Sequence, residues 1–333
     1  MSMSVTIATS PPAGSDAPTM SPAGAPRGAD MPAIHTSGLT KTYGARNAVD
    51  GVSIAVPRGV IAGFVGPNGA GKTTTIRMLL GLIRPTAGTA EVLGVATTEP
   101  AGYLPHVGAL IEGPAFYPGL TARRNLDILA TLGRIDRARV DPLLARVGLQ
   151  GRERDAVKTY SLGMRQRLGI AAALLPDPTM LILDEPTNGL DPAGILEVRQ
   201  LLRGLRDQGL TVLVSSHLLA EVEQMADWLI LLDKGRVVYQ GSMEALLSGR
   251  TGTLVVGAAT AEELGIVAAV ARKYQYESAI VDGRLRVQAP AAFARDLNKG
   301  AMEACVVLTE LRNEQSSLEE SFFSLTETEG VAS

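Results

Sequence analysis

The sequence predicts an α/β fold built on a mainly parallel sheet. From Ile34 onward, apolar strand-like stretches alternate with amphipathic helical stretches, which is the pattern of parallel strands joined by helical crossovers. A glycine-rich turn at residues 66–73 separates an apolar strand from an amphipathic helix, and a second apolar strand, at residues 180–183, ends abruptly in two acids. These observations also indicate where chemically active side chains gather.

The strands and helices follow in order along the chain. Residues 1–32 are rich in Pro, Ala, Ser, Gly and Thr, and we interpret them as a disordered N-terminal extension. A main domain is expected over residues 33–248, with helices dominating about residues 102–175 as an insertion in the α/β core. The expected strands are residues 51–56, 60–65, 180–183, 210–214 and 228–232.

A small α+β accessory domain is expected over residues 252–326, followed by a tail at 327–333. The expected order is a strand at 253–256, a helix at 261–272, a hairpin turning at Asp282-Gly283, a helix at 291–297 and a strand at 306–308. This β-α-β-β-α-β order suggests a ferredoxin-like domain, closed by a helix at 317–325.

Composition limits the classes of function. The chain has 333 residues, 46% hydrophobic and 20% charged, which is typical of a globular protein. Its formal net charge of -3 gives no general basic field for nucleic acid. The single cysteine, Cys305, favours a cytoplasmic location, and no apolar run approaches the roughly 20 residues needed to cross a bilayer.

Residues 66–73 fit the phosphate-binding motif G-x-x-x-x-G-K-[ST] in the strand-to-helix context that the motif requires. The glycines let backbone N–H groups surround phosphates, Lys72 reaches the outer phosphates, and the Thr73 hydroxyl ligates Mg²⁺. An ordinary glycine-rich turn is the alternative, because the chain holds 36 glycines. The predicted nucleotide-binding residues are Gly66, Pro67, Asn68, Gly69, Ala70, Gly71, Lys72, Thr73 and Thr74.

Two adjacent acids follow the apolar strand at residues 180–183. Beside a bound triphosphate, Asp184 holds Mg²⁺ and Glu185 polarises the water that attacks the γ-phosphate. The alternative is a solvated acidic turn, the usual fate of an isolated acid pair. The phosphate loop in the same chain favours the catalytic interpretation.

The run from Tyr160 to Arg167 begins a helix whose small residues leave backbone donors open to an anion. With this run, the chain resembles the ATP-binding cassette (ABC) family, whose members carry a phosphate loop, a signature of the type L-S-G-G-Q, and an acidic strand end followed by a D-loop. Here the signature is Tyr160-Ser161-Leu162-Gly163-Met164 and the D-loop is Gly189-Leu190-Asp191. The resemblance covers residues 34–242 and implies a P-loop NTPase fold, a RecA-like core with a helical insertion.

The resemblance also assigns single positions. Tyr43 stands where the family has an aromatic residue that stacks on adenine, and His217 stands at the switch histidine, which contacts the γ-phosphate. Glu112 replaces the Q-loop glutamine, and its carboxylate still offers oxygen to Mg²⁺. The implied catalytic residues are Glu185, His217 and Lys72, and the implied metal ligands are Thr73, Glu112 and Asp184. The further implied nucleotide-binding residues are Ser161, Leu162, Gly163, Met164 and Asp191, of which Ser161 and Gly163 contact the γ-phosphate bound to a second copy.

Glu112, the Ser-Leu-Gly-Met signature and residues 114–117 are most similar to the bacitracin and daunorubicin type of exporter ATPases. The resemblance implies an ATPase, with ATP and Mg²⁺ bound, that dimerises with a second nucleotide-binding subunit. It also implies attachment to the cytoplasmic face of the cell membrane through an ABC-2-type permease, with drug or antibiotic efflux as an associated role. The permease, not this chain, selects the substrate.

Two other classes of protein compete with this interpretation. Soluble ABC ATPases that act on ribosomes or DNA carry two cassettes with a charged linker, long coiled-coil insertions or zinc-binding cysteines, and this sequence shows none of these features. A non-catalytic nucleotide-binding regulatory module is the third alternative. The presence of Lys72, Asp184, Glu185 and His217 favours catalysis over it.

Overall fold

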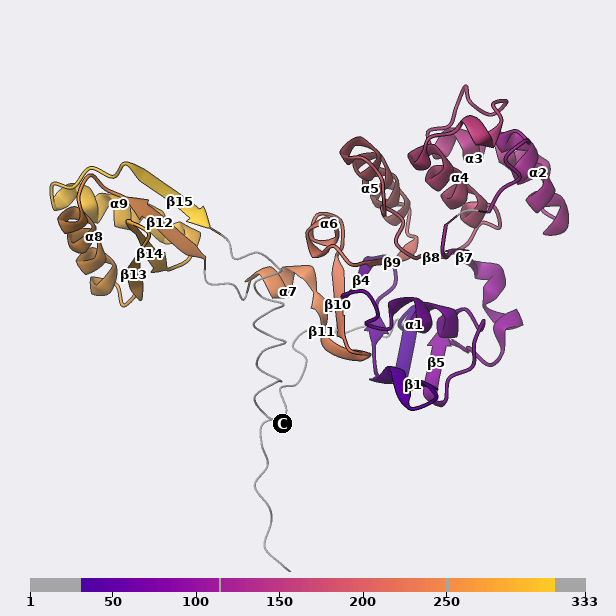
Figure 1. The fold of residues 1–333 in the computed structure, drawn as a ribbon, viewed down its shortest axis with the longest axis horizontal. Helices are drawn as coiled ribbons and strands as arrows, with labels where there is room; N and C mark the ends of the chain where they lie inside the picture. Colours follow the sequence, from indigo (N-terminus) through magenta and orange to yellow (C-terminus); the bar gives the residue numbers. More distant parts are fainter. Residues whose placement is uncertain (1–30, 114, 249–251, 315–333) are drawn as a thin grey trace, which may run out of the picture.

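The structure is a computed structural model, which describes residues 31–113, 115–248 and 252–314. The extension expected at residues 1–32 falls almost wholly outside the described residues, as do the closing helix at 317–325 and the tail at 327–333. Figure 1 shows the described elements in chain order, from indigo to yellow.

A six-stranded sheet forms the centre of the cassette, in the order β11-β10-β4-β9-β8-β7. All neighbouring pairs are parallel except β10 and β11. Alternate residues enter two separate cores, as in β4, where Ile61 and Val65 face one core and Ala62 and Phe64 the other. Burial on both faces explains the unbroken apolar runs in the sequence. The strands are β4 (Ile61–Val65), β7 (Val107–Leu110), β8 (Met180–Leu183), β9 (Thr211–Ser216), β10 (Trp228–Asp233) and β11 (Arg236–Ser242).

A second, antiparallel sheet has the order β2-β1-β5-β6, with β3 paired to β1, so a mainly parallel sheet describes only one of the two sheets. The single strand expected at 51–56 is wrong, because it divides into β2 and β3. The buried Thr36 hydroxyl donates to the Val52 carbonyl at 2.8 Å and accepts from the Ile54 amide at 3.0 Å, which interrupts the strand ladder there. The strands are β1 (Ile34–Tyr43), β2 (Arg46–Val52), β3 (Ala55–Val56), β5 (Ala87–Val92) and β6 (Val95–Ala96).

Helices α4, α5 and α6 contact strands of the central sheet, and α2, α3 and α4 lie together in Figure 1. The helical insertion expected from residue 102 begins later, because β7 joins the parallel sheet beside β8. The sequence signal of β7 is weak because two of its four residues are small. A Cβ at Gly108 would lie 2.1 Å from the Ala173 carbonyl oxygen of α4. The α-helices are α1 (Lys72–Leu79), α2 (Ala122–Leu132), α3 (Val140–Arg146), α4 (Leu162–Leu174), α5 (Pro192–Asp207), α6 (Leu219–Glu223) and α7 (Met243–Ser248).

Short 3₁₀ segments complete the described part of the cassette: η1 (Pro100–Gly102), η2 (Leu104–His106), η3 (Arg137–Arg139) and η4 (Val157–Thr159). Among the residues that the structure describes, no helix is both long and apolar enough to cross a membrane.

Residues 252–314 form a four-stranded antiparallel sheet in the order β13-β14-β12-β15. One face packs on the helices through a core that includes Leu254, Val267 and Leu297. The strand expected at 306–308 is wrong, because β15 begins at Glu310 and its Glu-Leu-Arg-Asn-Glu sequence is too polar to signal a strand. The elements are β12 (Thr253–Gly257), α8 (Ala261–Lys273), β13 (Ser278–Val281), β14 (Arg284–Gln288), η5 (Ala291–Phe293), α9 (Ala294–Glu303) and β15 (Glu310–Glu314).

Ion pairs join β14 and β15, the two strands that flank β12, and further pairs form within β15. The Arg284 guanidinium hydrogen-bonds Glu310, which lowers the pKa of the Glu310 carboxyl and raises the pKa of Arg284. Arg312 pairs with Glu310 at 2.8 Å and with Glu314 at 2.6 Å. The charges on β14 and β15 are therefore largely satisfied within the domain.

Candidate nucleotide-binding site

The phosphate loop runs from the end of β4 to the start of α1. Gly71 is the N-cap residue of α1 with φ 101°, and a Cβ there would lie 2.5 Å from the Ala48 carbonyl oxygen. Gly69 also has positive φ, 83°. Residues other than glycine rarely adopt such backbone angles. The two glycines therefore allow the turn that places N–H donors at the helix N-terminus.

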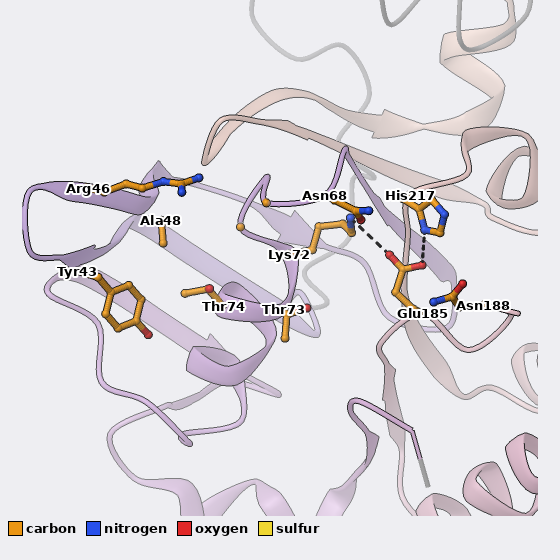
Figure 2. A pocket seen from close by; sticks show the side chains of 12 residues that line it. Tyr43, Arg46, Ala48, Asn68, Lys72, Thr73, Thr74, Glu185, Asn188 and His217 are labelled. Carbon is orange, nitrogen blue, oxygen red and sulfur yellow. Dashed lines mark hydrogen bonds and ion pairs between the residues drawn. The ribbon is translucent and has the colours of Figure 1, made fainter.

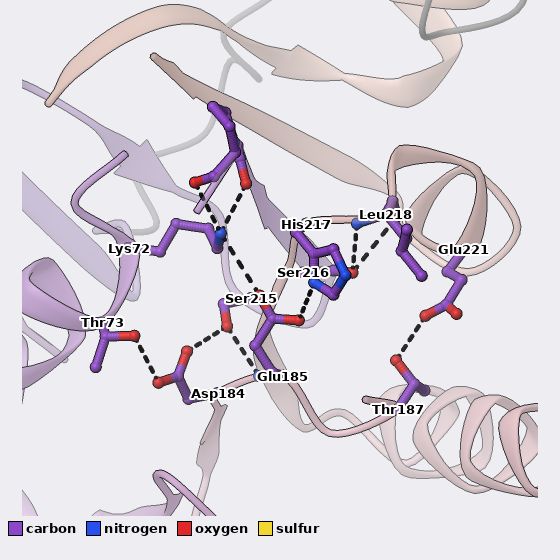
Figure 3. A network of polar contacts seen from close by, with 12 residues as sticks. Lys72, Thr73, Asp184, Glu185, Thr187, Ser215, Ser216, His217, Leu218 and Glu221 are labelled. Atoms are coloured by element: carbon purple, nitrogen blue, oxygen red, sulfur yellow. Dashed lines mark hydrogen bonds and ion pairs between the residues drawn. The ribbon is translucent and has the colours of Figure 1, made fainter. Parts of the chain in front are cut away.

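Lys72 is buried at the centre of this loop. Its Nζ donates to the carbonyl oxygens of Gly66 at 2.7 Å and Pro67 at 3.3 Å (Figure 3). The same Nζ lies 3.5 Å from Oε1 of Glu185. The loop's one cation is therefore held between the loop carbonyls and the acid at the end of β8.

Asp184 and Glu185 follow β8, and Ser215 of the neighbouring strand β9 contacts both (Figure 3). The Ser215 hydroxyl donates to Asp184 and accepts from the Glu185 backbone N–H at 2.9 Å. Asp184 Oδ2 also accepts from the Thr73 hydroxyl at 2.8 Å. A side-chain hydrogen bond thus connects the end of β8 to the start of α1.

His217 directly follows β9, and its Nδ1 lies 2.8 Å from Oε2 of Glu185. Glu185 itself has φ 50°, in the left-handed backbone region that residues other than glycine seldom occupy. Strained backbone of this kind is common at functional sites. The Glu185 carboxylate therefore has one oxygen near Lys72 and the other at His217.

A cavity of about 650 Å³ opens over these residues (Figure 2). Tyr43 lies at one end, and Glu185 and His217 lie at the other, with the phosphate loop between them. The lining residues are Tyr43, Arg46, Ala48, Asn68, Gly69, Gly71, Lys72, Thr73, Thr74, Glu185, Asn188 and His217. The structure thus gathers nine of the predicted site residues around one cavity, whereas Pro67 and Ala70 line a neighbouring cavity of about 320 Å³.

Sequence reasoning missed three lining residues and one supporting residue. Arg46 and Ala48 follow Tyr43 in the β1–β2 hairpin, so their spacing from Tyr43 is the signal that could have indicated them. The Arg46 side chain lines the cavity and has no hydrogen bond or ion pair with another described side chain. Asn188 belongs to the run before the D-loop, and Ser215 carries no sequence signal of its support for the two acids.

The signature and D-loop residues lie outside this cavity. Ser161 is the N-cap of α4 and accepts from the Met164 amide at 3.2 Å, and Asp191 caps α5 by accepting from the Gly194 amide at 3.0 Å. Leu162 is exposed, and a Cβ on Gly189 would lie 3.2 Å from it. The two motifs therefore neighbour each other, separately from the phosphate loop of the same chain.

Tyr160, the first signature position, is a buried anchor. Its hydroxyl donates to the Arg152 carbonyl at 2.7 Å, and burial raises the pKa of its phenol. Glu112 also lies outside the lining of the cavity, and its carboxylate pairs with Arg77 of α1.

The oxygen atoms of Thr73 and Asp184 fit the donor set of Mg²⁺, which prefers hydroxyl, carboxylate and phosphate oxygens and keeps several waters. Within the described residues, no group of three or more His, Cys, Asp or Glu side chains is arranged to hold a metal ion. The site therefore suits a cation that arrives with phosphate ligands of its own.

A sequence model of the family described as "ABC transporter" matches residues 49–188. The chain is 37% identical over 305 residues to the bacitracin transport ATP-binding protein BcrA of Enterococcus faecalis, covering 90% of this chain and 98% of that protein. This chain belongs to the ABC transporter family. It is also 49% identical to BcrA of Bacillus licheniformis over 62% of this chain and 68% of that protein. Identity to the daunorubicin/doxorubicin resistance ATP-binding protein DrrA of Streptomyces peucetius is 42%, over 65% and 67% of the two chains.

Solved structures give the same result. An ATP-binding subunit of an ABC transporter superposes with a TM-score of 0.58 at 31% identity, covering 65% of this chain and 92% of the other. A dimeric, post-hydrolysis ATP-binding cassette bound to ADP and Pi superposes with a TM-score of 0.57 at 25% identity, covering 63% and 98%.

These similarities confirm the predicted P-loop NTPase fold and the prediction of an ABC transporter ATP-binding subunit with ATPase activity coupled to transport. They support the transport ATPase over the soluble ABC ATPase. The roles of individual site residues remain predictions.

Proposed function

We propose that two copies of this chain form the ATP-driven motor of an ABC exporter. One observation carries this proposal: the phosphate loop, Glu185 and His217 line a single cavity, whereas the signature residues of the same chain lie outside it. Such an arrangement is incomplete in one chain. The signature of a second copy, with Ser161 and Gly163, would complete the site over the γ-phosphate.

The side chains divide the chemistry among them. Lys72 neutralises charge on the outer phosphates, and the loop N–H groups bind the phosphate oxygens. Glu185 accepts a proton from the attacking water, and His217 holds the Glu185 carboxylate and contacts the γ-phosphate. Tyr43 stacks on the adenine at the opposite end of the cavity.

Mg²⁺ would be held by the Thr73 hydroxyl and the Asp184 carboxylate, and Glu112 would offer a third oxygen once its carboxylate leaves Arg77. When bound, the ion neutralises charge that develops on the phosphate oxygens. Ser215 holds the Asp184 carboxylate in place for this task.

A groove of about 360 Å³ runs between β7, the loop after it, and helices α2 and α4. Ile111, Phe116 and Leu129 give it an apolar lining. We assign this groove to a membrane permease of the ABC-2 type, which would hold the chain peripherally at the cytoplasmic face of the membrane. Export of a drug or peptide antibiotic fits the names of the relatives, which include bacitracin, lantibiotic and daunorubicin proteins.

Replacing Leu129 with glutamate tests the docking of the permease. Leu129 lines the groove and is 38% exposed, so a charge there would oppose an apolar contact with little cost to the fold. In the native host, we expect the Leu129→Glu variant to lose most of its membrane-bound fraction, while the isolated subunit binds ATP as before.

Leu132→Glu is the matched control, because Leu132 lies on the same helix, is 77% exposed and does not line the groove. Sedimentation of membranes followed by immunoblotting measures both variants. An unchanged membrane-bound fraction in Leu129→Glu would remove the groove from the proposal.

A further inference from the structure

Arg77 and Glu112 form an ion pair outside the cavity, between helix α1 and the turn after β7. Arg77 lies on α1, and Glu112 lies in the turn that follows β7. The pair joins residues 35 positions apart in the sequence. Within the described residues, Arg77 is the partner of the Glu112 carboxylate.

Both partners stand next to the candidate metal ligands. Arg77 follows Thr73 by one helical turn, so the two side chains share a face of α1. Glu112 follows β7, whose Leu110 carbonyl accepts a hydrogen bond from the Asp184 amide at 2.8 Å. The Arg77–Glu112 pair therefore borders the Thr73–Asp184 pair, between the same helix and the same edge of the sheet.

The Arg77–Glu112 ion pair is exposed to solvent, so the contact can open and re-form. The Arg77 side chain is 38% exposed and the Glu112 side chain 64% exposed, so solvent screens their attraction. Glu112 has φ 57° and the adjacent Gly113 has φ 87°, both in the left-handed region. A glycine next to Glu112 gives the turn freedom to move the carboxylate.

We propose that Arg77 is a positioning residue that competes with Mg²⁺ for the Glu112 carboxylate. The inference rests on the proposed nucleotide site and adds a control on its metal affinity. When Glu112 pairs with Arg77, its charge is directed to α1, and binding to the metal requires that this contact opens. A glutamine at this position would have no charge to pair with Arg77, so the device depends on the acid found in this chain.

The test measures ATP affinity by calorimetry twice, once with MgCl₂ and once with EDTA, and takes the ratio of the two affinities. Arg77→Met should raise this ratio about two- to fivefold, the range expected from a partly exposed ion pair. Arg77→Lys should give a ratio near that of the wild type, because it keeps the charge. Affinity in EDTA should be the same in all three proteins.

One matched background and one control variant separate competition from a general loss of positive charge. In the Glu112→Gln background, Arg77→Met should leave the ratio unchanged. In the wild-type background, Arg84→Met should also leave the ratio unchanged, because it removes an exposed arginine shortly after α1. An unchanged ratio in Arg77→Met would overturn the inference, and so would an equal rise in the Glu112→Gln background. Failure of the proposed function would look different, because wild-type protein would then bind ATP in neither buffer.

Discussion

Glu185→Gln is expected to stop ATP turnover while ATP binding persists. The Glu185 carboxylate lies between Lys72 and His217 at the end of the cavity, where it can accept a proton from the attacking water. An amide cannot accept that proton, and loss of a general base lowers a rate by about 100-fold or more. Phosphate release measures turnover, and binding of a fluorescent ATP analogue measures affinity.

Glu197→Gln serves as the control, because it makes the same change at an exposed site on α5. Its turnover should equal that of the wild type. Near-normal turnover in Glu185→Gln would mean that another group activates the water, and the catalytic role of Glu185 would be withdrawn.

Lys72→Ala should fail at an earlier step, because it removes the buried cation that the loop carbonyls hold at the phosphate position. Charge-assisted contacts to phosphate are among the strong hydrogen bonds, so we expect ATP affinity to fall by about tenfold or more. Calorimetry measures the loss, and circular dichroism confirms that the variant folds. Lys299→Ala, at an exposed position on α9, should bind ATP normally. Equal affinity in Lys72→Ala and the wild type would contradict the assignment of the phosphate loop.

The sequence predicts best those elements that are buried on both faces. β8 occurs at residues 180–183 as predicted, because all four residues are buried and form one apolar run. β7 and β15 escape prediction for opposite reasons, since β7 has small residues that admit the backbone of α4, and β15 is mostly polar. Hydrophobic pattern alone therefore identifies core strands and misses edge strands.

The site residues, too, fall into those that the sequence predicts and those that it does not. The phosphate loop and the two acids have local motifs, and the structure brings them together around Lys72. The pairing of Arg77 with Glu112, and the support that Ser215 gives to both acids, join distant segments and have no local pattern. Such contacts depend on the register of neighbouring strands, which the sequence does not show residue by residue.

The central claim is that the signature of one copy completes the phosphate loop of another. Ser161 is exposed at the start of α4, outside the cavity that Asn68 lines, and Cys305 is the single native cysteine of the chain. Two proteins would carry Cys305→Ser and Glu185→Gln, one with Asn68→Cys and the other with Ser161→Cys, and each would be oxidised alone and as a mixture with and without MgATP. The account predicts a disulfide-linked dimer on non-reducing gels only in the mixture, and only with MgATP. A mixture that stays monomeric with MgATP, while both proteins bind the nucleotide, would contradict it.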